Sequence, residues 1–230
     1  TVCSIFINPT QFNNINDFKE YPQNIENDLR LLDAAECDIV YTPDYKDLYK
    51  ENEKVKKYKF NGLERNLEGK HRPGHFNGVA TIIEKFLMII NPDYAFFGEK
   101  DLQQLLIIQL LVKKTRMNVK IVGCPTKRDE NGLALSSRNK LLSKEDLLHS
   151  SIIHKQLLFC KKNFSKTSII ELKNTIIKNL TKSKKIEIDY FEFVKAATFQ
   201  PVLVINKEIK YAACIAVKIS GVRLIDNIIL

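Results

Sequence analysis

Short apolar runs alternate with amphipathic segments along the first half of the sequence. Helical spacing of apolar residues, which predicts amphipathic helices, occurs at 23–36, 78–90 and 101–114. Runs that predict buried strands lie between them, at 2–7, 38–43, 93–97 and 118–124. Strands that alternate with helices are typical of a parallel sheet with helices on both faces. We therefore expect an α/β fold over residues 1–126.

The pattern changes after Pro125. A polar turn at 127–132 predicts a domain boundary, and two helical segments follow at 144–161 and 167–182. Three strand-like runs then close the sequence, at 186–195, 210–219 and 222–229. Helices followed by a run of strands indicate a smaller α+β domain, which we expect over residues 127–230.

Composition and charge narrow the classes of function. The 230 residues carry a net charge of +9, but lysines crowd 155–195, a helical and solvated stretch, so we expect no nucleic-acid partner. No apolar run is long enough for a transmembrane helix. The five cysteines are widely spaced, which indicates reduced thiols in a cytoplasmic protein. The sequence opens inside an apolar run, without a signal peptide, as if the residues before a strand were missing.

In parallel sheets, ligands bind where the strands end, so the segments after the strands are the candidate sites. Asn8 and Gln11 follow the first strand. Their amides suit recognition of hydroxyl and carboxylate groups on a polar substrate. The alternative is a simple turn, in which Asn8 and Pro9 end the strand.

The segment Gly98-Glu99-Lys100-Asp101 joins a strand to a helix. Gly98 allows a ligand to approach the backbone closely, and Lys100 supplies a point charge for phosphate. Asp101 could cap the helix or help to order a metal-bound phosphate. Gln104 begins the helix and is expected, like Gln103, to face the same rim. The alternative is that Asp101 is only a cap and Lys100 only a surface residue.

Two further segments carry cations. Arg72 lies in the basic turn 70–76 before a helix, an arrangement that favours an anion. Leu135-Ser136-Ser137-Arg138 combines two hydroxyls with a guanidinium, which together suit phosphate oxygens. A solvent loop and a helix-entry loop are the respective alternatives. No histidine spacing indicates a metal site, and no serine hydrolase pattern is present. The combination fits a nucleoside triphosphate and a small polar acid.

These segments resemble the pantothenate synthetase (pantoate–β-alanine ligase) family. The resemblance is specific, because six segments match in the family's order and extend almost from end to end. They are SIFINPTQF (4–12), LEGKHRPGHFNGVAT (67–81), PDYAFFGEKDLQQL (92–105), GLALSSRN (132–139), and the pair IDYFEFV (188–194) and RLIDN (223–227).

The resemblance implies a Rossmann-like domain of the nucleotidyltransferase type, a smaller C-terminal domain over the site, and a homodimer. ATP and Mg²⁺ are used, and pantoate reacts through pantoyl adenylate with β-alanine to give pantothenate. Asn8, Gln11, Arg72 and Gln104 would then serve the substrates. The ATP site would comprise Gly98, Glu99, Lys100, Asp101, Lys127, Leu135, Ser136, Ser137 and Arg138, with Lys100, Ser136, Ser137 and Arg138 active in catalysis.

One family motif is absent from this sequence. The HxGH-type motif, which supplies a catalytic histidine, lies in the family before the strand that opens this sequence, and none of the four histidines here belongs to such a motif. The matching strand of the sheet would be missing too, which would leave unpaired strand edges. We expect a part of a longer ligase. The alternatives are a catalytically inactive homologue that serves as a binding or dimerisation module, and a nucleic-acid-binding protein.

Overall fold

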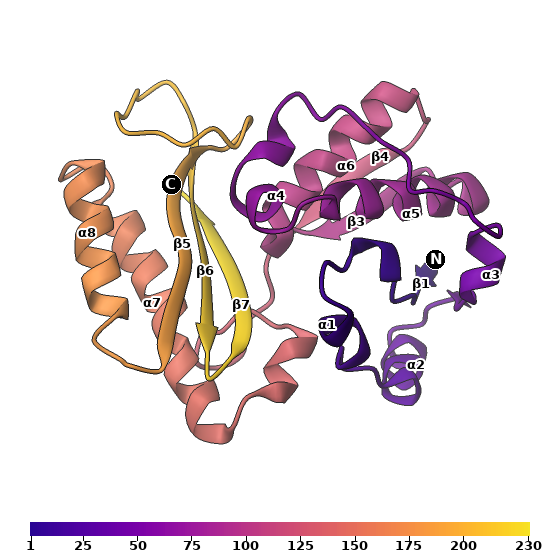
Figure 1. The fold of residues 1–230 in the computed structure, drawn as a ribbon, viewed down its shortest axis with the longest axis horizontal. Coiled ribbons are helices and arrows are strands. Elements are labelled where there is room, and N and C mark those ends of the chain that lie inside the picture. Colours follow the sequence, from indigo (N-terminus) through magenta and orange to yellow (C-terminus); the bar gives the residue numbers. More distant parts are fainter.

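The computed structural model describes residues 1–230, which form two groups of elements (Figure 1). The first group ends at Cys124 and alternates short strands with helices. Its elements are β1 (Val2–Ser4), η1 (Pro9–Gln11), α1 (Ile15–Lys19), α2 (Ile25–Ala34), β2 (Ile39–Tyr41), α3 (Tyr45–Leu48), η2 (Leu63–Arg65), α4 (Leu67–His71), α5 (His75–Ile90), β3 (Tyr94–Gly98), η3 (Glu99–Asp101), α6 (Leu102–Thr115) and β4 (Lys120–Cys124).

The strands of this group are parallel, but they form two separate pairs. β1 pairs with β2 in the register Val2↔Ile39, and β3 pairs with β4 in the register Tyr94↔Lys120. No ladder of hydrogen bonds joins one pair to the other. The predicted α/β class and parallel pairing are therefore confirmed. The single continuous sheet that the alternation suggested is instead divided in two.

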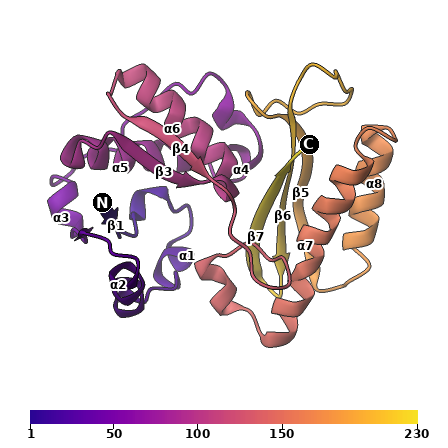
Figure 2. The ribbon, with the colours of Figure 1, turned by 180° about the vertical axis from the view of Figure 1, so that it is seen from behind.

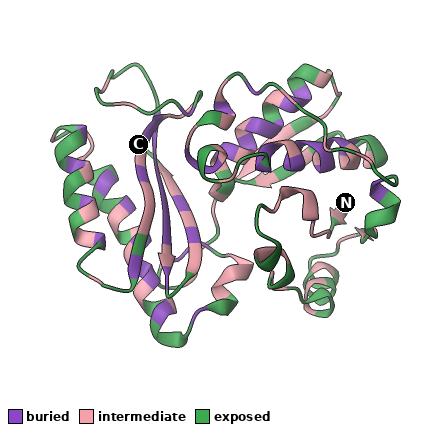
Figure 3. Ribbon diagram, viewed as in Figure 1, coloured by how far each residue is buried: buried purple, intermediate pink, exposed green.

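Helix α5 packs through its apolar side chains against the first pair of strands and against helix α6. Ile82 and Phe86 pack with Phe6 and Tyr41, next to β1 and β2. Phe76 and Ala80 belong to another cluster, which includes residues of α6. Figure 3 shows buried positions repeating along both helices. The 3.6-residue spacing read in the sequence thus corresponds to burial.

The second group of elements is an antiparallel sheet covered by two helices. Figure 2 shows α7 and α8 packed side by side across one face of the sheet, whose strand order is β5–β6–β7. A core cluster of 17 buried residues joins helices and sheet, as the predicted α+β unit requires. The elements are η4 (Ser137–Leu141), α7 (Lys144–Asn163), α8 (Ile169–Leu180), β5 (Ile186–Lys195), β6 (Tyr211–Ile219) and β7 (Val222–Ile229).

An apolar cluster also joins the two groups. Val194, Ala212 and Cys214 of the C-terminal sheet pack with Phe60 and Leu111 of the first group. The two groups therefore share a buried core, although the chain between them passes through a polar turn. The boundary between residues 126 and 127 stays a prediction.

The sequence missed the short elements. The stretch 44–67, over which no element was expected, contains α3 and η2, and the predicted basic turn at 70–76 begins within α4. Each of these elements spans only three to five residues, which is too short to display a period. β1 ends at Ser4 rather than at residue 7 because β2, its partner, ends at Tyr41. None of the helices combines the length and the apolar character needed to cross a bilayer.

One close backbone contact places η1 at the end of β1. A Cβ atom on Gly78 of α5 would lie 2.5 Å from the Thr10 carbonyl oxygen and 2.9 Å from Gln11 Cα, so only glycine allows this approach. Asn8 strengthens it: its side-chain amide donates to the Gly78 carbonyl and accepts from the Tyr49 hydroxyl. The position of Gln11 thus depends on α5.

We predict that Gly78→Ala lowers the free energy of unfolding by about 1–3 kcal/mol, because the added methyl group overlaps backbone atoms that cannot move aside freely. Urea unfolding followed by circular dichroism measures the change. Gly98→Ala is the matched control for stability, since nothing lies within 4 Å of its Cβ position and its φ is −68°. Equal stability of Gly78→Ala and the parent protein would contradict the close packing.

Candidate functional site

Side chains from both groups of elements surround one cavity of about 760 Å³. Its lining includes the segments that follow β1 and β3, which agrees with the rule that ligands bind at the ends of parallel strands. The turn before α5, the segment around η4, and strands β5 and β7 complete the wall. The cavity is therefore shared between the α/β half and the C-terminal sheet.

Gln11 lines this cavity from η1, and two side chains, one from the turn before α5 and one from the first residue of α5, contact its backbone carbonyl. His75 Nδ1 lies 2.9 Å from the Gln11 carbonyl oxygen, and Arg72 Nη2 donates to the same oxygen at 3.4 Å. A carbonyl oxygen can only accept, so His75 Nδ1 carries the hydrogen. In the neutral ring, Nε2 is then free to accept from Arg72 Nη1 at 3.3 Å.

His75 is uncharged in this arrangement. Burial, reinforced by the positive charge of Arg72, lowers the pKa of His75 to about 4. Its ring therefore acts as a fixed neutral donor to Gln11, not as a cation in the cavity. Arg72 carries the positive charge at this end of the cavity.

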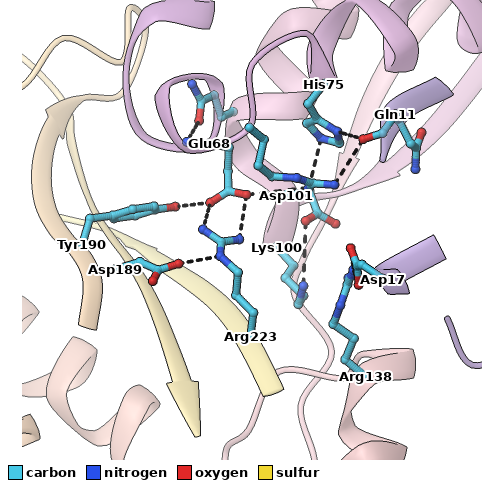
Figure 4. Close-up of polar contacts among 12 residues, drawn as sticks. Gln11, Asp17, Glu68, His75, Lys100, Asp101, Arg138, Asp189, Tyr190 and Arg223 are labelled. Carbon is cyan, nitrogen blue, oxygen red and sulfur yellow. Dashed lines mark hydrogen bonds and ion pairs between the residues drawn. The ribbon is translucent and has the colours of Figure 1, made fainter. Parts of the chain in front are cut away.

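Lys100 and Asp101 enter the cavity from η3, the turn between β3 and α6 (Figure 4). The Lys100 ammonium lies 3.8 Å from the Asp101 carboxylate, without a hydrogen bond that would fix the pair. Asp101 occupies the N-cap position of α6, yet its side chain caps no backbone N–H. Asn227 of β7 donates to the carbonyls of Glu99 and Lys100 at 2.9 and 2.8 Å, which ties this turn to the C-terminal sheet.

Ser136, Ser137 and Arg138 line the same cavity from the start of η4. Arg138 Nη2 contacts both carboxylate oxygens of Asp17, at 2.7 and 2.9 Å, and its guanidinium lies 5.1 Å from the centre of the Tyr21 ring. Asp17 belongs to α1, so this ion pair connects the segment after β1 to the segment after the polar turn. Arg138, the cation that the sequence predicted to bind phosphate, is thus paired with the Asp17 carboxylate of the protein itself.

Glu68 lies buried between the two groups of elements. Its carboxylate accepts from Arg223 Nη1 and Nη2 at 2.9 and 2.7 Å and from the Tyr190 hydroxyl at 2.8 Å. Burial acts to raise the pKa of Glu68, but the hydrogen bonds and charge of Arg223 outweigh it, so this pKa lies below its ordinary value. Arg223 also donates to Asp189 at 2.7 Å through Nε.

The structure brings most of the predicted site residues to one place. Gln11, Arg72, Lys100, Asp101, Gln104, Leu135, Ser136, Ser137 and Arg138 all line the cavity. Asn8, Gly98, Glu99 and Lys127 lie outside its lining. Gln103, which we expected beside Gln104 at the rim, also lines the cavity, while its side-chain amide donates to the carbonyls of Leu63 and Asn66.

Several residues of the site escaped the sequence analysis. Arg223 and Asn227 lie in the strand sequence VRLIDNII, where polar side chains interrupt an apolar run, and that interruption was the available signal. Asn139 lines the cavity with a buried Oδ1 that has no hydrogen-bond partner. Asp17 gave no local signal, because its partner Arg138 is 121 residues away.

The arrangement offers cations and neutral donors rather than a nucleophile or a metal cage. No group of three or more His, Cys, Asp or Glu side chains is placed to hold a metal ion. Lys100 and Arg138 supply positive charge, and Ser136 and Ser137 supply hydroxyl donors. Such a set can bind an anion and stabilise negative charge that develops on it.

Comparisons with known proteins agree on one family. A family model described as pantoate-beta-alanine ligase matches residues 1–229. A curated relative from Flavobacterium psychrophilum, named pantothenate synthetase, is 43% identical over 99% of this chain and 81% of its own length. A second, from Cytophaga hutchinsonii and of the same name, is 40% identical over 100% of this chain and 82% of its own.

Solved structures give the same result. The crystal structure of pantothenate synthetase from Thermus thermophilus is 34% identical, with a TM-score of 0.90 over 99% of this chain and 82% of that chain. The pantoate-beta-alanine ligase of Francisella tularensis, crystallised with beta-gamma ATP and β-alanine, is 35% identical, with a TM-score of 0.75 over 99% and 78% of the two chains.

We predict that protonation of His75 destabilises the fold in acid. Its pKa is lowered to about 4 from the ordinary 6.5, so the unfolded chain binds more protons between these values. The free energy of unfolding should therefore be highest above pH 6.5 and fall towards pH 4, by up to about 3 kcal/mol from this residue. Urea unfolding at a series of pH values measures the slope.

His75→Gln is expected to flatten that slope, because glutamine does not titrate. Burial also lowers the pKa of His154, so His154→Gln serves as the control that measures the contribution of this second histidine. An unchanged slope in His75→Gln would show that His75 is not held neutral by the fold.

Proposed function

The chain belongs to the pantoate-β-alanine ligase family, and on that premise we propose that the protein joins pantoate to β-alanine in an ATP-dependent reaction. The observation that carries the proposal is the lining of one cavity by two kinds of groups. Lys100, Arg138, Ser136 and Ser137 suit a polyphosphate, whereas Gln11 and Gln104 suit a small hydroxy acid.

The proposed reaction has two steps. A pantoate carboxylate oxygen attacks the α-phosphorus of ATP, which forms pantoyl adenylate and releases pyrophosphate. The amine of β-alanine then attacks the acyl carbon, so that a C–N bond forms, AMP leaves, and the amine loses a proton. No covalent bond to the protein is needed, which fits a cavity without an activated nucleophile.

The cavity residues would serve these steps by charge and orientation. Lys100 and Arg138 would neutralise negative charge as one anion attacks another, and Ser136 and Ser137 would donate to phosphate oxygens. Gln11 and Gln104 would orient pantoate, and Arg72 would attract the anionic substrates. Asn139 Oδ1, a buried acceptor without a partner, would accept a hydrogen bond from a ligand.

The nucleotide would extend from these phosphate groups along the backbone of Gly98, Glu99, Lys127 and Leu135. The Asp101 carboxylate, which caps no helix N–H, is the available oxygen ligand for a Mg²⁺ ion carried by the phosphates. Such an ion would neutralise phosphate charge. The homodimer and the cytoplasmic location implied by the resemblance stay predictions.

The protein is predicted to convert ATP, pantoate and β-alanine into AMP, pyrophosphate and pantothenate. Pantoate labelled with ¹⁸O in its carboxylate tests the order of steps, because attack on the α-phosphorus transfers one label to AMP. Mass spectrometry of the nucleotide detects that label. Formation of ADP and phosphate, or no turnover with all three substrates present, would overturn the proposal.

Lys100→Gln should lower kcat/KM by about 100-fold or more, since it removes a charge that stabilises the transition state. Lys113→Gln is the control: Lys113 lies in the last turn of α6, is exposed and lines no part of the cavity. Equal kcat/KM values for the two variants would remove Lys100 from the proposed mechanism.

We predict that Asp17→Asn lowers the KM for ATP. In the ligand-free protein, the Asp17 carboxylate occupies Arg138, and a triphosphate must compete for the same guanidinium. Because a partly exposed ion pair contributes about 1 kcal/mol at most, the expected gain is up to roughly fivefold. Initial rates at saturating pantoate and β-alanine measure it.

Glu20→Gln removes the same charge from the end of α1, where no ion pair is formed, and should leave the KM for ATP unchanged. A KM for ATP that is equal or higher in Asp17→Asn would contradict the competition.

A further inference from the structure

We propose that Glu68 is a positioning residue, whose charge holds Arg72 beside the Gln11 backbone at a place set by the C-terminal sheet. The inference rests on the proposed function, because it concerns the pantoate end of that cavity. It assigns a role to a carboxylate that contacts neither η3, which carries Lys100, nor η4, which carries Arg138. The physical basis is a continuous set of contacts that starts on β5 and β7 and ends on η1 (Figure 4).

The first contacts join the C-terminal sheet to α4. Tyr190 of β5 and Arg223 of β7 both donate to the Glu68 carboxylate, within 2.9 Å. Arg223 is itself held from its other side by Asp189. Planar two-point pairing of guanidinium and carboxylate fixes direction as well as distance. The Glu68 carboxylate therefore follows the position of the sheet.

The next contacts lead from Glu68 to Gln11. Arg72, one turn further along, lies 3.7 Å from the Glu68 carboxylate and contacts His75 and the Gln11 carbonyl. His75 donates to the same carbonyl. The backbone of Gln11, whose side chain lines the cavity, is thus placed by two residues, one of which pairs with Glu68.

Charge explains why Glu68 matters more to Arg72 than to Arg223. Without Glu68, Arg223 would keep Asp189 as an anionic partner. Arg72 has no other carboxylate within 4 Å. Burial already lowers the pKa of Arg72, which shows that its charge is poorly solvated where it lies. Loss of Glu68 would leave Arg72, a partly buried charge, without a carboxylate partner and free to leave Gln11.

The helix that carries Glu68 cannot move to compensate. Gln103 of α6 accepts from the Glu68 backbone N–H at 3.1 Å and donates to two carbonyls just before α4. A Cβ atom on Gly69 would lie 2.0 Å from the Glu64 carbonyl oxygen, so the backbone here is tightly packed. Glu68 is consequently held from α6 while its carboxylate is held from the sheet.

The test measures the KM for pantoate and the KM for ATP separately in Glu68→Gln. Glutamine keeps the size and an acceptor for Tyr190 but removes the charge. We expect the KM for pantoate to rise at least tenfold and the KM for ATP to change less than twofold, with calorimetry showing weaker pantoate binding by the same factor. An equal rise of both constants, or no rise, would overturn the proposal.

A double variant distinguishes the positioning of Arg72 by Glu68 from a contribution of Glu68 to the stability of the contact between the two halves. Glu68→Leu with Arg223→Met replaces the buried ion pair by apolar side chains of similar volume, a change that often preserves stability. We expect the thermal midpoint to return to that of the parent protein while the KM for pantoate stays raised, because Arg72 still lacks its partner. A KM for pantoate that recovers with the midpoint would mean that Glu68 is structural only.

The control is Glu192→Gln, which breaks the half-buried ion pair between Glu192 of β5 and Lys173 of α8, away from the cavity. Both KM values should stay at the parent level. Failure of the proposed function is distinguishable, because the parent protein itself would then neither bind pantoate nor form AMP.

Discussion

The buried ion pair between Glu68 and Arg223 is the constraint on which the shape of the site depends. A buried charge is costly unless it is paired and hydrogen-bonded, so an orientation of the two halves that joins these groups is favoured over one that separates them. Apolar packing around Phe60 and Val194 makes the halves adhere. Such packing is non-directional, however, whereas a two-point ion pair admits one geometry. The position of the cavity therefore depends on both the apolar packing and the ion pair.

Close backbone approaches transmit that geometry to the ligand-binding segments. Gly78 lets η1 rest directly on α5, and Gly69 lets α4 rest on the turn before it. Asn227 then holds η3 by two carbonyls. For η1 and η3, a segment too short to be stable alone is thereby held by a longer element, α5 or β7. The backbone of the site is therefore closely held even though many of its side chains come from short turns.

Local patterns explain which parts of this arrangement the sequence could predict. β5, β7 and helices α5 and α6 were predicted within a few residues, because each is long enough to display a period. The segments that contain Lys100 and Arg138 were found because chemistry-bearing residues cluster within four or five positions. The contacts of Glu68 were not predictable in this way, since Arg223 lies 155 residues away and Tyr190 lies 122 away. Asn8 illustrates the opposite case, in which a residue suited to ligand binding is used by the fold itself.

The ion pairs around the cavity also differ in how readily an incoming anion can replace the carboxylate partner. Asp17 and Asp101, the partners of Arg138 and Lys100, keep 39% and 47% of their side chains exposed. Glu68, the partner of Arg223, keeps only 9%. An exposed pair contributes about 1 kcal/mol at most and is easily replaced, while breaking a buried pair costs about 3–5 kcal/mol. An incoming anion can therefore displace the carboxylates at Lys100 and Arg138 but not the one at Arg223. The positive charges of the cavity thus divide into those whose carboxylate partner is exposed and exchangeable and one whose partner is buried.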